Sequence, residues 1–196
     1  MPGDRKTSRR SIRIPGFDYS GSSSYFITIC THNRKPIFGK CVADKIHLFK
    51  LGELVVAYWS GIPDHCRQVE LDEFVIMPNH IHGIIHIHPS RGRGTACLAP
   101  TVEEFGQPVA GSLPTIVRSF KSAVTRDWRL IAVDPDYPVW QRNYYEHVVR
   151  DREELNHLRQ YISHNPMMWN SDPLYGWGIW AKHQYPGYLS RAADLP

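Results

Sequence analysis

The chain has 196 residues, of which 42% are hydrophobic and 21% charged, and its formal net charge is +4. This length suits one well-buried domain and is short for two of ordinary size. The sequence has no run of about 18 apolar residues, so we expect no membrane span, and the basic start lacks the apolar stretch of a secretory signal. We therefore expect a cytoplasmic protein. Its four cysteines form no Cys-x-x-Cys pair, which favours reduced thiols.

The positive charge gathers at the N-terminus. Residues 1–13 hold five Lys and Arg residues against one Asp, so this segment carries +4 and the remaining chain is neutral. A basic flexible arm over residues 1–15 suits a polyanionic partner such as nucleic acid, although solvated tails share this composition. We expect one domain over residues 16–170. An irregular aromatic tail over residues 171–196 is expected to pack on that domain.

Residue patterns along the chain predict a fixed order of strands and helices. The predicted elements are a strand at 25–31, a helix at about 42–60, strands at 68–77 and 80–88, a helix at about 112–131, a strand ending near 150 and a helix at 151–165. A long Gly-rich and Pro-rich loop fills residues 89–112. The first six elements match the ferredoxin-like split β-α-β arrangement. This is an α+β fold with a four-stranded antiparallel sheet and helices on one face, and the helix at 151–165 lies outside the repeat.

The predicted strand at 80–88 places histidines on one face. Side chains of a strand alternate between its faces, so Ile81, Ile85 and Ile87 share one face. The other face holds His80, His82, Ile84, His86 and His88. Two imidazoles two residues apart can bind one divalent ion, although the pair alone is a weak motif. His88 would lie about 20 Å from His82, too far to share its ion, so we assign His86 and His88 to the surface, with DNA contact as the alternative.

The predicted helix at 151–165 adds a tyrosine and an amide to the histidine pair. Tyr161 and Asn165 are four residues apart and therefore lie on one flank of that helix. Together with His80 and His82 they suggest a metal site in which the ion is the Lewis acid and Tyr161 the nucleophile. Tyr144 and Tyr145 are alternative nucleophiles. On a strand, neither has a ligand partner one helical turn away.

Four groups of residues occur together and in order. They are Met-Pro-Asn-His-Ile-His-Gly at 77–83, Ser-Phe-Lys-Ser at 119–122, Trp140 and Gln141 followed by Tyr-Glu-His at 145–147 and Arg150, and Tyr-Ile-Ser-His-Asn-Pro at 161–166. In these motifs the chain closely resembles the single-tyrosine HUH transposases, especially the REP-associated tyrosine transposases of bacteria. The resemblance runs from about Tyr25 to Trp169. It implies a ferredoxin-like domain that cleaves single-stranded DNA beside hairpins.

The resemblance also implies roles for individual residues. His80 and His82 would be metal ligands, Asn165 the third protein ligand and Tyr161 the nucleophile. The implied reaction is transesterification without ATP: Tyr161 attacks a DNA phosphate, the 3′-hydroxyl leaves, and a 5′-phosphotyrosine link forms. The implied cofactor is Mg²⁺ or Mn²⁺, which would polarise and orient the phosphate. The implied partner is single-stranded DNA with hairpins, and a monomer and a homodimer both remain open.

Basic residues and one histidine are candidate DNA contacts. They are Arg118, Lys121 and Arg129 on the helix at 112–131, Arg91 and Arg93 in the long loop, and His147 and Arg150 in the last strand. Each has an ordinary structural alternative, namely a solvated helix face, a mobile insertion or a packed strand residue. Two other function classes also remain. The chain can be a noncatalytic nucleic-acid-binding module, or a small-molecule metal hydrolase in which a bound water attacks.

Overall fold

We analysed a computed structural model of the chain, which describes residues 19, 21–88, 109–172 and 174. The expected N-terminal arm, most of the long loop with Arg91 and Arg93, and nearly all of the expected tail lie outside these residues. No helix among the described residues is long and apolar enough to cross a membrane. Among them, Cys30, Cys41 and Cys66 are free thiols.

A four-stranded antiparallel sheet lies at the centre, with strand order β4-β5-β1-β6. Its strands are β1 (Ser23–Cys30), β4 (Val69–Met77), β5 (His80–Ile87) and β6 (Tyr145–Val149). Helices α1 (Lys50–Ser60) and α3 (Leu113–Arg129) complete the series β1-α1-β4-β5-α3-β6. This order and pairing confirm the predicted α+β, ferredoxin-like arrangement.

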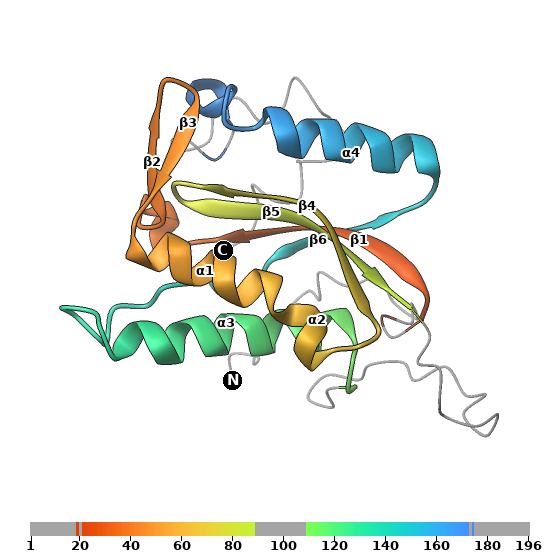
Figure 1. Cartoon of the computed structure of the whole chain (residues 1–196), viewed down its shortest axis with the longest axis horizontal. Coiled ribbons are helices and arrows are strands. Elements are labelled where there is room, and N and C mark those ends of the chain that lie inside the picture. The colour runs from red at the N-terminus through yellow and green to blue at the C-terminus, as the bar shows by residue number, and fades with distance from the viewer. Residues whose placement is uncertain (1–18, 20, 89–108, 173, 175–196) are drawn as a thin grey trace, which may run out of the picture.

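Three helices cover the two faces of the sheet. Helices α1 and α3 lie against one face, and α4 (Arg152–His164) lies against the other (Figure 1). Alternate residues of β1 serve the two sides: Ile27 belongs to the larger core under α1 and α3, whereas Phe26 packs under α4. Strand β5 alternates in the same way: Ile85 belongs to the larger core and Ile84 to the smaller one.

A β-hairpin replaces the first half of the helix predicted at 42–60. Strands β2 (Gly39–Val42) and β3 (Lys45–Leu48) pair antiparallel, and α1 begins only after Phe49. The turn residues Ala43 and Asp44 both adopt positive φ, which is the backbone conformation of a tight two-residue hairpin. The prediction was wrong here because Ala-Asp is not an obvious hairpin turn, and Ile46 happens to fit a helical spacing with the residues of α1.

Three short helical segments complete the described chain. They are η1 (His32–Arg34), α2 (Ile62–His65) and η2 (Trp169–Ser171). Helix α4 begins as predicted, because the side chain of Asp151 accepts a hydrogen bond from the backbone N–H of Glu154 at 2.8 Å. The Glu154 carboxylate in turn accepts from the backbone N–H of Arg150 at 2.7 Å. These contacts fix the start of the helix that carries Tyr161.

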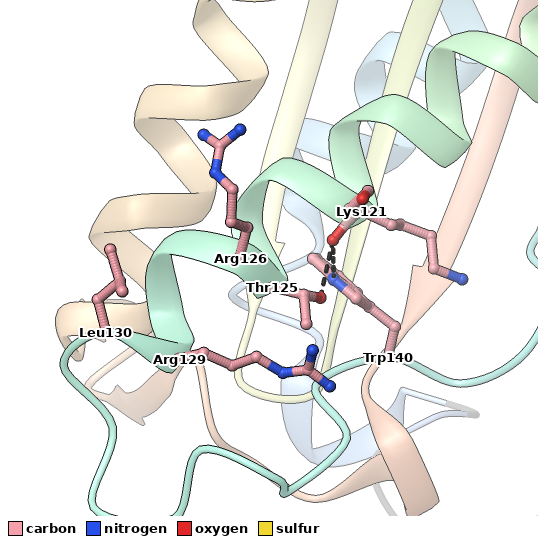
Figure 2. A pocket seen from close by; sticks show the side chains of 7 residues that line it. Lys121, Thr125, Arg126, Arg129, Leu130 and Trp140 are labelled. Atoms are coloured by element: carbon pink, nitrogen blue, oxygen red, sulfur yellow. Dashed lines mark hydrogen bonds between the residues drawn. The ribbon is translucent and has the colours of Figure 1, made fainter.

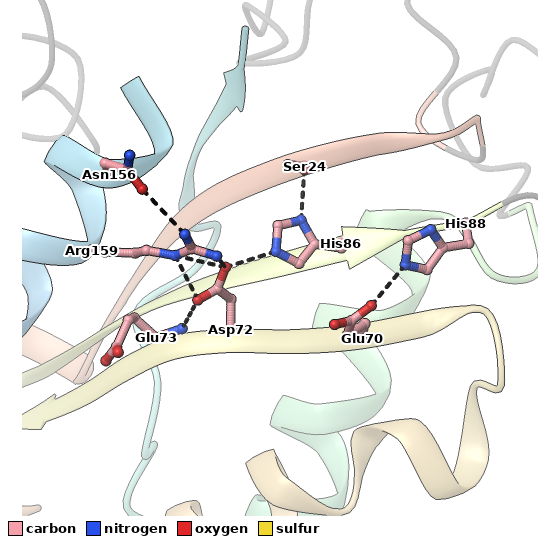
Figure 3. Close-up of polar contacts among 8 residues, drawn as sticks. All are labelled: Ser24, Glu70, Asp72, Glu73, His86, His88, Asn156 and Arg159. Atoms are coloured by element: carbon pink, nitrogen blue, oxygen red, sulfur yellow. Dashed lines mark hydrogen bonds and ion pairs between the residues drawn. The ribbon is translucent and has the colours of Figure 1, made fainter. Parts of the chain in front are cut away.

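A polar network across the sheet also anchors α4. The guanidinium of Arg159 donates to both carboxylate oxygens of Asp72 on β4, with contacts from 2.6 to 3.1 Å (Figure 3). Asp72 also bonds Nε2 of His86 at 2.8 Å, and Nδ1 of His86 lies 2.6 Å from the Ser24 hydroxyl. His86 is thus held inside a structural network, while His88 pairs with Glu70 near the strand end. Arg159 is two residues from Tyr161, so this network helps to set where that tyrosine lies.

Candidate metal and tyrosine site

His80 and His82 stand side by side at the start of β5, on the face that α4 covers. Both are fully buried, and their Nε2 atoms lie 3.1 Å apart. The two-residue spacing places both imidazoles on one face of the strand, as predicted, and the antiparallel partner β1 contributes Thr28 opposite His82. The sequence pattern therefore brings two ring nitrogens to one point beneath α4.

The other ring nitrogens have fixed partners. Nδ1 of His80 lies 2.7 Å from Oδ1 of Asn79, whose amide group donates to the Leu174 carbonyl at 2.7 Å. This arrangement leaves Oδ1 as the acceptor, so His80 carries its proton on Nδ1 and presents a lone pair at Nε2. Nδ1 of His82 lies 2.8 Å from the buried Thr28 hydroxyl. Such outer contacts orient imidazoles that bind metals in proteins.

Both imidazoles are neutral near pH 7. Burial, followed by the nearby charge of Arg34, lowers the pKa of His80 to about 3. Burial, followed by the proximity of His80, holds the pKa of His82 well below its usual range. Neutral imidazoles are the form that binds a divalent ion. Two lone pairs 3.1 Å apart repel each other unless a proton or a cation lies between them.

Asp172 adds a carboxylate to the pair. Its Oδ2 lies 3.7 Å from Nε2 of His80, and burial raises the pKa of this carboxyl group. The ligand atoms of His80, His82 and Asp172 all lie within 4.8 Å of one another, so the three buried side chains can hold a metal ion. We did not predict Asp172 from the sequence, because it follows η2 and belongs to no motif of fixed spacing.

Asn165, the predicted third ligand, lies next to this group at the C-terminal end of α4. Its side chain is 2% exposed and hydrogen bonds to Asp172. Its Oδ1 is buried and has no hydrogen-bond partner among the described residues. An unpaired buried acceptor is costly, and an amide oxygen can bind a hard cation. The donor set of two imidazoles, a carboxylate and an amide oxygen therefore fits a divalent ion.

Tyr161 reaches the same point from α4. Its Oη lies 3.3 Å from Nε2 of His82, and its ring packs on His82 and on Phe26. The alternative tyrosines are placed differently. Tyr144 belongs to the core under α1 and α3, and Tyr145 packs edge-on against Phe26 in the smaller core. The Tyr161 hydroxyl is thus in contact with a histidine of the pair.

The candidate DNA contacts Arg118, Lys121 and Arg129 form a basic stripe on α3, which lies on the opposite face of the sheet from α4 (Figure 1). The Lys121 ammonium donates to the carbonyls of Gln141 and Asn143 at 2.7 and 3.0 Å, and burial lowers its pKa to about 8. Arg129 donates to the Pro135 carbonyl, and Arg118 is exposed. The stripe borders a shallow pocket of about 560 Å³. In this pocket the Trp140 indole N–H donates a hydrogen bond to the Lys121 carbonyl (Figure 2).

The two remaining predicted contacts lie at the start of α4. Nε2 of His147 pairs with Oε1 of Glu154 at 2.9 Å, so this histidine supports the helix cap. The Arg150 side chain is exposed, and its backbone N–H donates to Glu154. Any DNA contact by Arg118, Lys121, Arg129, His147 or Arg150 stays a prediction.

Comparison with known proteins adds a close sequence relative and two distant structures. No protein-family model matches the chain. A search of solved structures found a REP-associated tyrosine transposase bound to a REP hairpin, with 16% identity, a TM-score of 0.48, and 74% of this chain and 67% of that chain covered. It also found a candidate transposase from Deinococcus radiodurans R1, with 18% identity, a TM-score of 0.41, and 77% and 95% coverage.

The sequence relative is an uncharacterized protein of Haemophilus influenzae strain Rd. It is 41% identical over 170 residues, which span 85% of this chain and 93% of that protein. This identity over nearly the full length of both proteins places the two in one family. The chain therefore belongs to the protein family that includes this Haemophilus influenzae protein.

Proposed function

We propose that the chain is a single-tyrosine transposase of the REP-associated type, which cleaves and rejoins single-stranded DNA near hairpins with Tyr161 as the nucleophile. One observation carries this proposal: the phenol of Tyr161 lies 3.3 Å from Nε2 of His82, which itself lies 3.1 Å from Nε2 of His80. The histidines come from β5 and Tyr161 from α4, and Tyr161 and His82 are 79 residues apart in the chain. The order of motifs described above supports the same function.

The residues that would hold a divalent ion are His80 and His82, with Asn165 and Asp172 completing the set. The two histidines are neutral and oriented by Asn79 and Thr28, and the Asn165 Oδ1 is an acceptor in need of a partner. When bound, Mg²⁺ or Mn²⁺ would polarise the phosphate and offset its charge. The carboxylate of Asp172 makes the set one ligand larger than the sequence predicts.

Tyr161 would attack the phosphorus of one phosphodiester. A bond forms between its Oη and the phosphorus, the bond from phosphorus to the 3′-oxygen breaks, and that oxygen leaves as a hydroxyl after taking up a proton. The Tyr161 phenol loses its own proton in this exchange. The product is a 5′-phosphotyrosine, so one phosphodiester replaces another and the link can be reversed for rejoining. A phenol is a poor nucleophile near neutral pH because it ordinarily ionises near pH 10.

The packing around Tyr161 suits this role. Its ring is fixed by Phe26 and His82, so little side-chain freedom remains to be lost when a phosphate is positioned. The side chain is only partly buried, in contrast to the fully buried histidines. Tyr161 is therefore less enclosed than the ligands that would bind the ion.

The test is a covalent adduct assay. Wild-type protein is mixed with single-stranded oligonucleotides that carry hairpins from beside its own gene, with Mg²⁺ or Mn²⁺, and denatured samples are separated on a gel. We expect a denaturation-resistant complex in the wild type and none in Tyr161→Phe. The matched controls are Tyr144→Phe and Tyr145→Phe, which remove a hydroxyl from tyrosines that pack in the two hydrophobic cores and should retain the adduct.

The outcomes separate the function classes. Hydrolysis that persists in Tyr161→Phe would indicate water as the nucleophile and a metal hydrolase. Tight DNA binding without an adduct, with both ions and a broad oligonucleotide set, would indicate a noncatalytic binding module. Either result overturns the proposed tyrosine mechanism.

A further inference from the structure

The segment around the β2–β3 hairpin is the most basic internal part of the chain. Residues 34–50 hold five Lys and Arg residues against one Asp, a formal charge of +4. Residues 1–13 carry another +4, and the whole chain also carries +4, so the rest of the protein has a net charge of −4. The positive charge of the described structure is therefore local. Such concentration favours binding of a polyanion at this segment.

The hairpin presents this charge on one face. In the pairing register Lys40 lies opposite His47 and Val42 opposite Lys45, so these four side chains share one face of the ribbon, and all four are exposed. The other face holds Cys41 opposite Ile46, and both are partly buried. The ribbon thus has an inner face against the protein and an outer face with two ammonium groups and an imidazole.

The charges on the outer face are not neutralised within the described chain. Neither Lys40 nor Lys45 forms an ion pair or a hydrogen bond with any residue that the structure describes. The acidic residue of the segment, Asp44, occupies the turn between the strands. Two exposed lysines on a short two-stranded ribbon form a compact positive surface.

The ribbon borders the candidate site at two points. At its base, the backbone N–H of Phe38 donates to the carbonyl of Pro78 at 3.0 Å, two residues before His80. On its inner face, the Cys41 thiol contacts the carbonyl of Pro166 at 3.6 Å, directly after Asn165. Figure 1 shows β2 and β3 standing beside the C-terminal end of α4. The ribbon is therefore fastened to both chain segments that supply the predicted ligands.

The basic stripe on α3 is a weaker candidate for the same role. Helix α3 lies on the opposite face of the sheet from α4, the helix that carries Tyr161 (Figure 1). Two of the three cations in the stripe also have partners within the protein: Lys121 donates to two carbonyls and Arg129 donates to the Pro135 carbonyl, whereas Arg118 is exposed. A strand held at Tyr161 would reach the ribbon far more easily than it would reach this stripe.

We propose that the outer face of the β2–β3 ribbon binds backbone phosphates of the DNA strand held at the candidate site, through Lys40 and Lys45 with the neighbouring His47. The identity of the polyanion rests on the proposed function. Ammonium groups on flexible stems bind phosphates as point charges and read no base sequence, so the ribbon holds the strand without selecting it. Base recognition would then lie elsewhere.

The test compares two double variants of the full chain. Lys40→Gln/Lys45→Gln removes two charges from the ribbon. Arg67→Gln/Arg152→Gln removes two charges from exposed positions at the opposite end of the molecule, beside α2 and at the start of α4 (Figure 1). Binding of a fluorescent single-stranded oligonucleotide is measured by anisotropy over a range of salt concentrations, and thermal unfolding checks that each variant is folded.

We expect the ribbon variant to bind about tenfold more weakly near 0.1 M salt, equally for different sequences. The slope of log affinity against log salt should become shallower by about 0.7 for each lysine that contacts a phosphate. The arginine variant should match the wild type. At saturating DNA, the ribbon variant should form the Tyr161 adduct at the wild-type rate, because its lost contacts act equally on bound substrate and transition state. A series of oligonucleotides shortened toward the cleaved phosphate should abolish the difference once the strand no longer reaches the ribbon.

The results separate this inference from the proposed function. If the wild type forms the adduct and the ribbon variant keeps the wild-type affinity and salt slope, the ribbon inference alone is wrong. An equal loss in the arginine variant also overturns it, because the effect would then follow net charge. If the wild type forms no adduct but the ribbon variant still loses DNA binding, the catalytic proposal fails and the ribbon inference stands. If the wild type binds no single-stranded DNA, the ribbon inference is wrong. An acidic protein would then be the alternative partner for this surface.

Discussion

The two faces of the central sheet differ in what they bury. Under α1 and α3, aromatic and aliphatic side chains pack closely: the Trp59 ring stacks on Phe74 with centroids 5.0 Å apart and meets Phe120 edge-on at 5.6 Å. Under α4, the same strands bury His80, His82 and Thr28 beside a few apolar residues. One face is a hydrophobic core, and the other is a polar site with a helix over it.

This difference indicates how the fold tolerates buried polar side chains that lower its stability. Buried polar side chains destabilise a fold unless they are hydrogen bonded, and Oδ1 of Asn165 has no such partner among the described residues. The larger core lies on the side of the sheet away from α4, where its packing can offset the cost of unpaired ligand atoms on the other face. We therefore expect substitutions on the α4 face to affect chemistry, and those on the α1 and α3 face to affect stability.

The largest effect should come from the histidine pair. We expect His80→Ala and His82→Ala each to reduce adduct formation more than a thousandfold, because each removes a nitrogen from the candidate metal site. Mn²⁺ should raise the melting temperature of the wild type and of His157→Ala, an exposed histidine on α4, but not of either site variant. Thermal unfolding with Mn²⁺ and with EDTA measures this. Site variants with adduct rates within tenfold of the wild type would contradict the assignment.

Replacement of Trp59 in the larger core should have the opposite effect, lowering stability while leaving adduct formation intact. Trp59 is 2% exposed, and Trp59→Ala should lower the free energy of unfolding by about 3–5 kcal/mol through the cavity that it leaves. Urea unfolding measures the loss. The fraction of protein that remains folded should still form the adduct at the wild-type rate. A selective loss of adduct formation with little loss of stability would show that the two faces are more strongly coupled than we infer.

A smaller effect is expected at Gly83 of β5, which lies on the face that α1 and α3 cover. A Cβ on Gly83 would overlap the Trp59 ring. We expect Gly83→Ala to lower the free energy of unfolding by about 1–3 kcal/mol. In a Trp59→Leu background the same change should cost less, since the smaller side chain leaves room. A double-mutant cycle measured by urea unfolding tests this, and additive effects would argue against the overlap as the cause.

The network that anchors α4 should give the smallest effect. Burial alone would raise the pKa of Asp72, but hydrogen bonds from Arg159 and His86 outweigh it and lower the pKa to about 2. We expect Asp72→Asn to lower the free energy of unfolding by about 1–2 kcal/mol at pH 7. Because the folded pKa lies below the ordinary 3.8, the carboxylate stabilises the fold fully above about pH 4 and loses this effect as the pH falls toward 2.

Urea unfolding at several pH values measures the contribution of Asp72. The difference in the free energy of unfolding between wild type and Asp72→Asn should decrease as the pH falls below about 4. Glu73→Gln is the matched control, because Glu73 is the exposed acidic neighbour in the same strand. If this difference stays constant down to pH 3, or if Glu73→Gln gives an equal difference, the ion pair with Arg159 does not anchor α4.

Local patterns determined much of this protein. The period of two in β5 was enough to place His80 and His82 on one face and Ile85 on the other, because alternation is a property of any strand. The cap at Asp151 and the four-residue spacing of Tyr161 and Asn165 likewise depend only on helix geometry near those residues. The fold class followed from the order of such elements.

Only the tertiary structure decided which distant residues meet. Asp172 joins His80 because the chain after α4 returns to the sheet, and no local spacing encodes that return. Lys121 looked like a free cation on a helix, yet its ammonium binds carbonyls about twenty residues later. The hairpin at β2–β3 depends on a turn in which Ala43 and Asp44 adopt positive φ, a conformation that Ala rarely adopts and that its residue type therefore does not predict. Contacts between distant segments depend on how elements pack, and sequence periodicity does not report this.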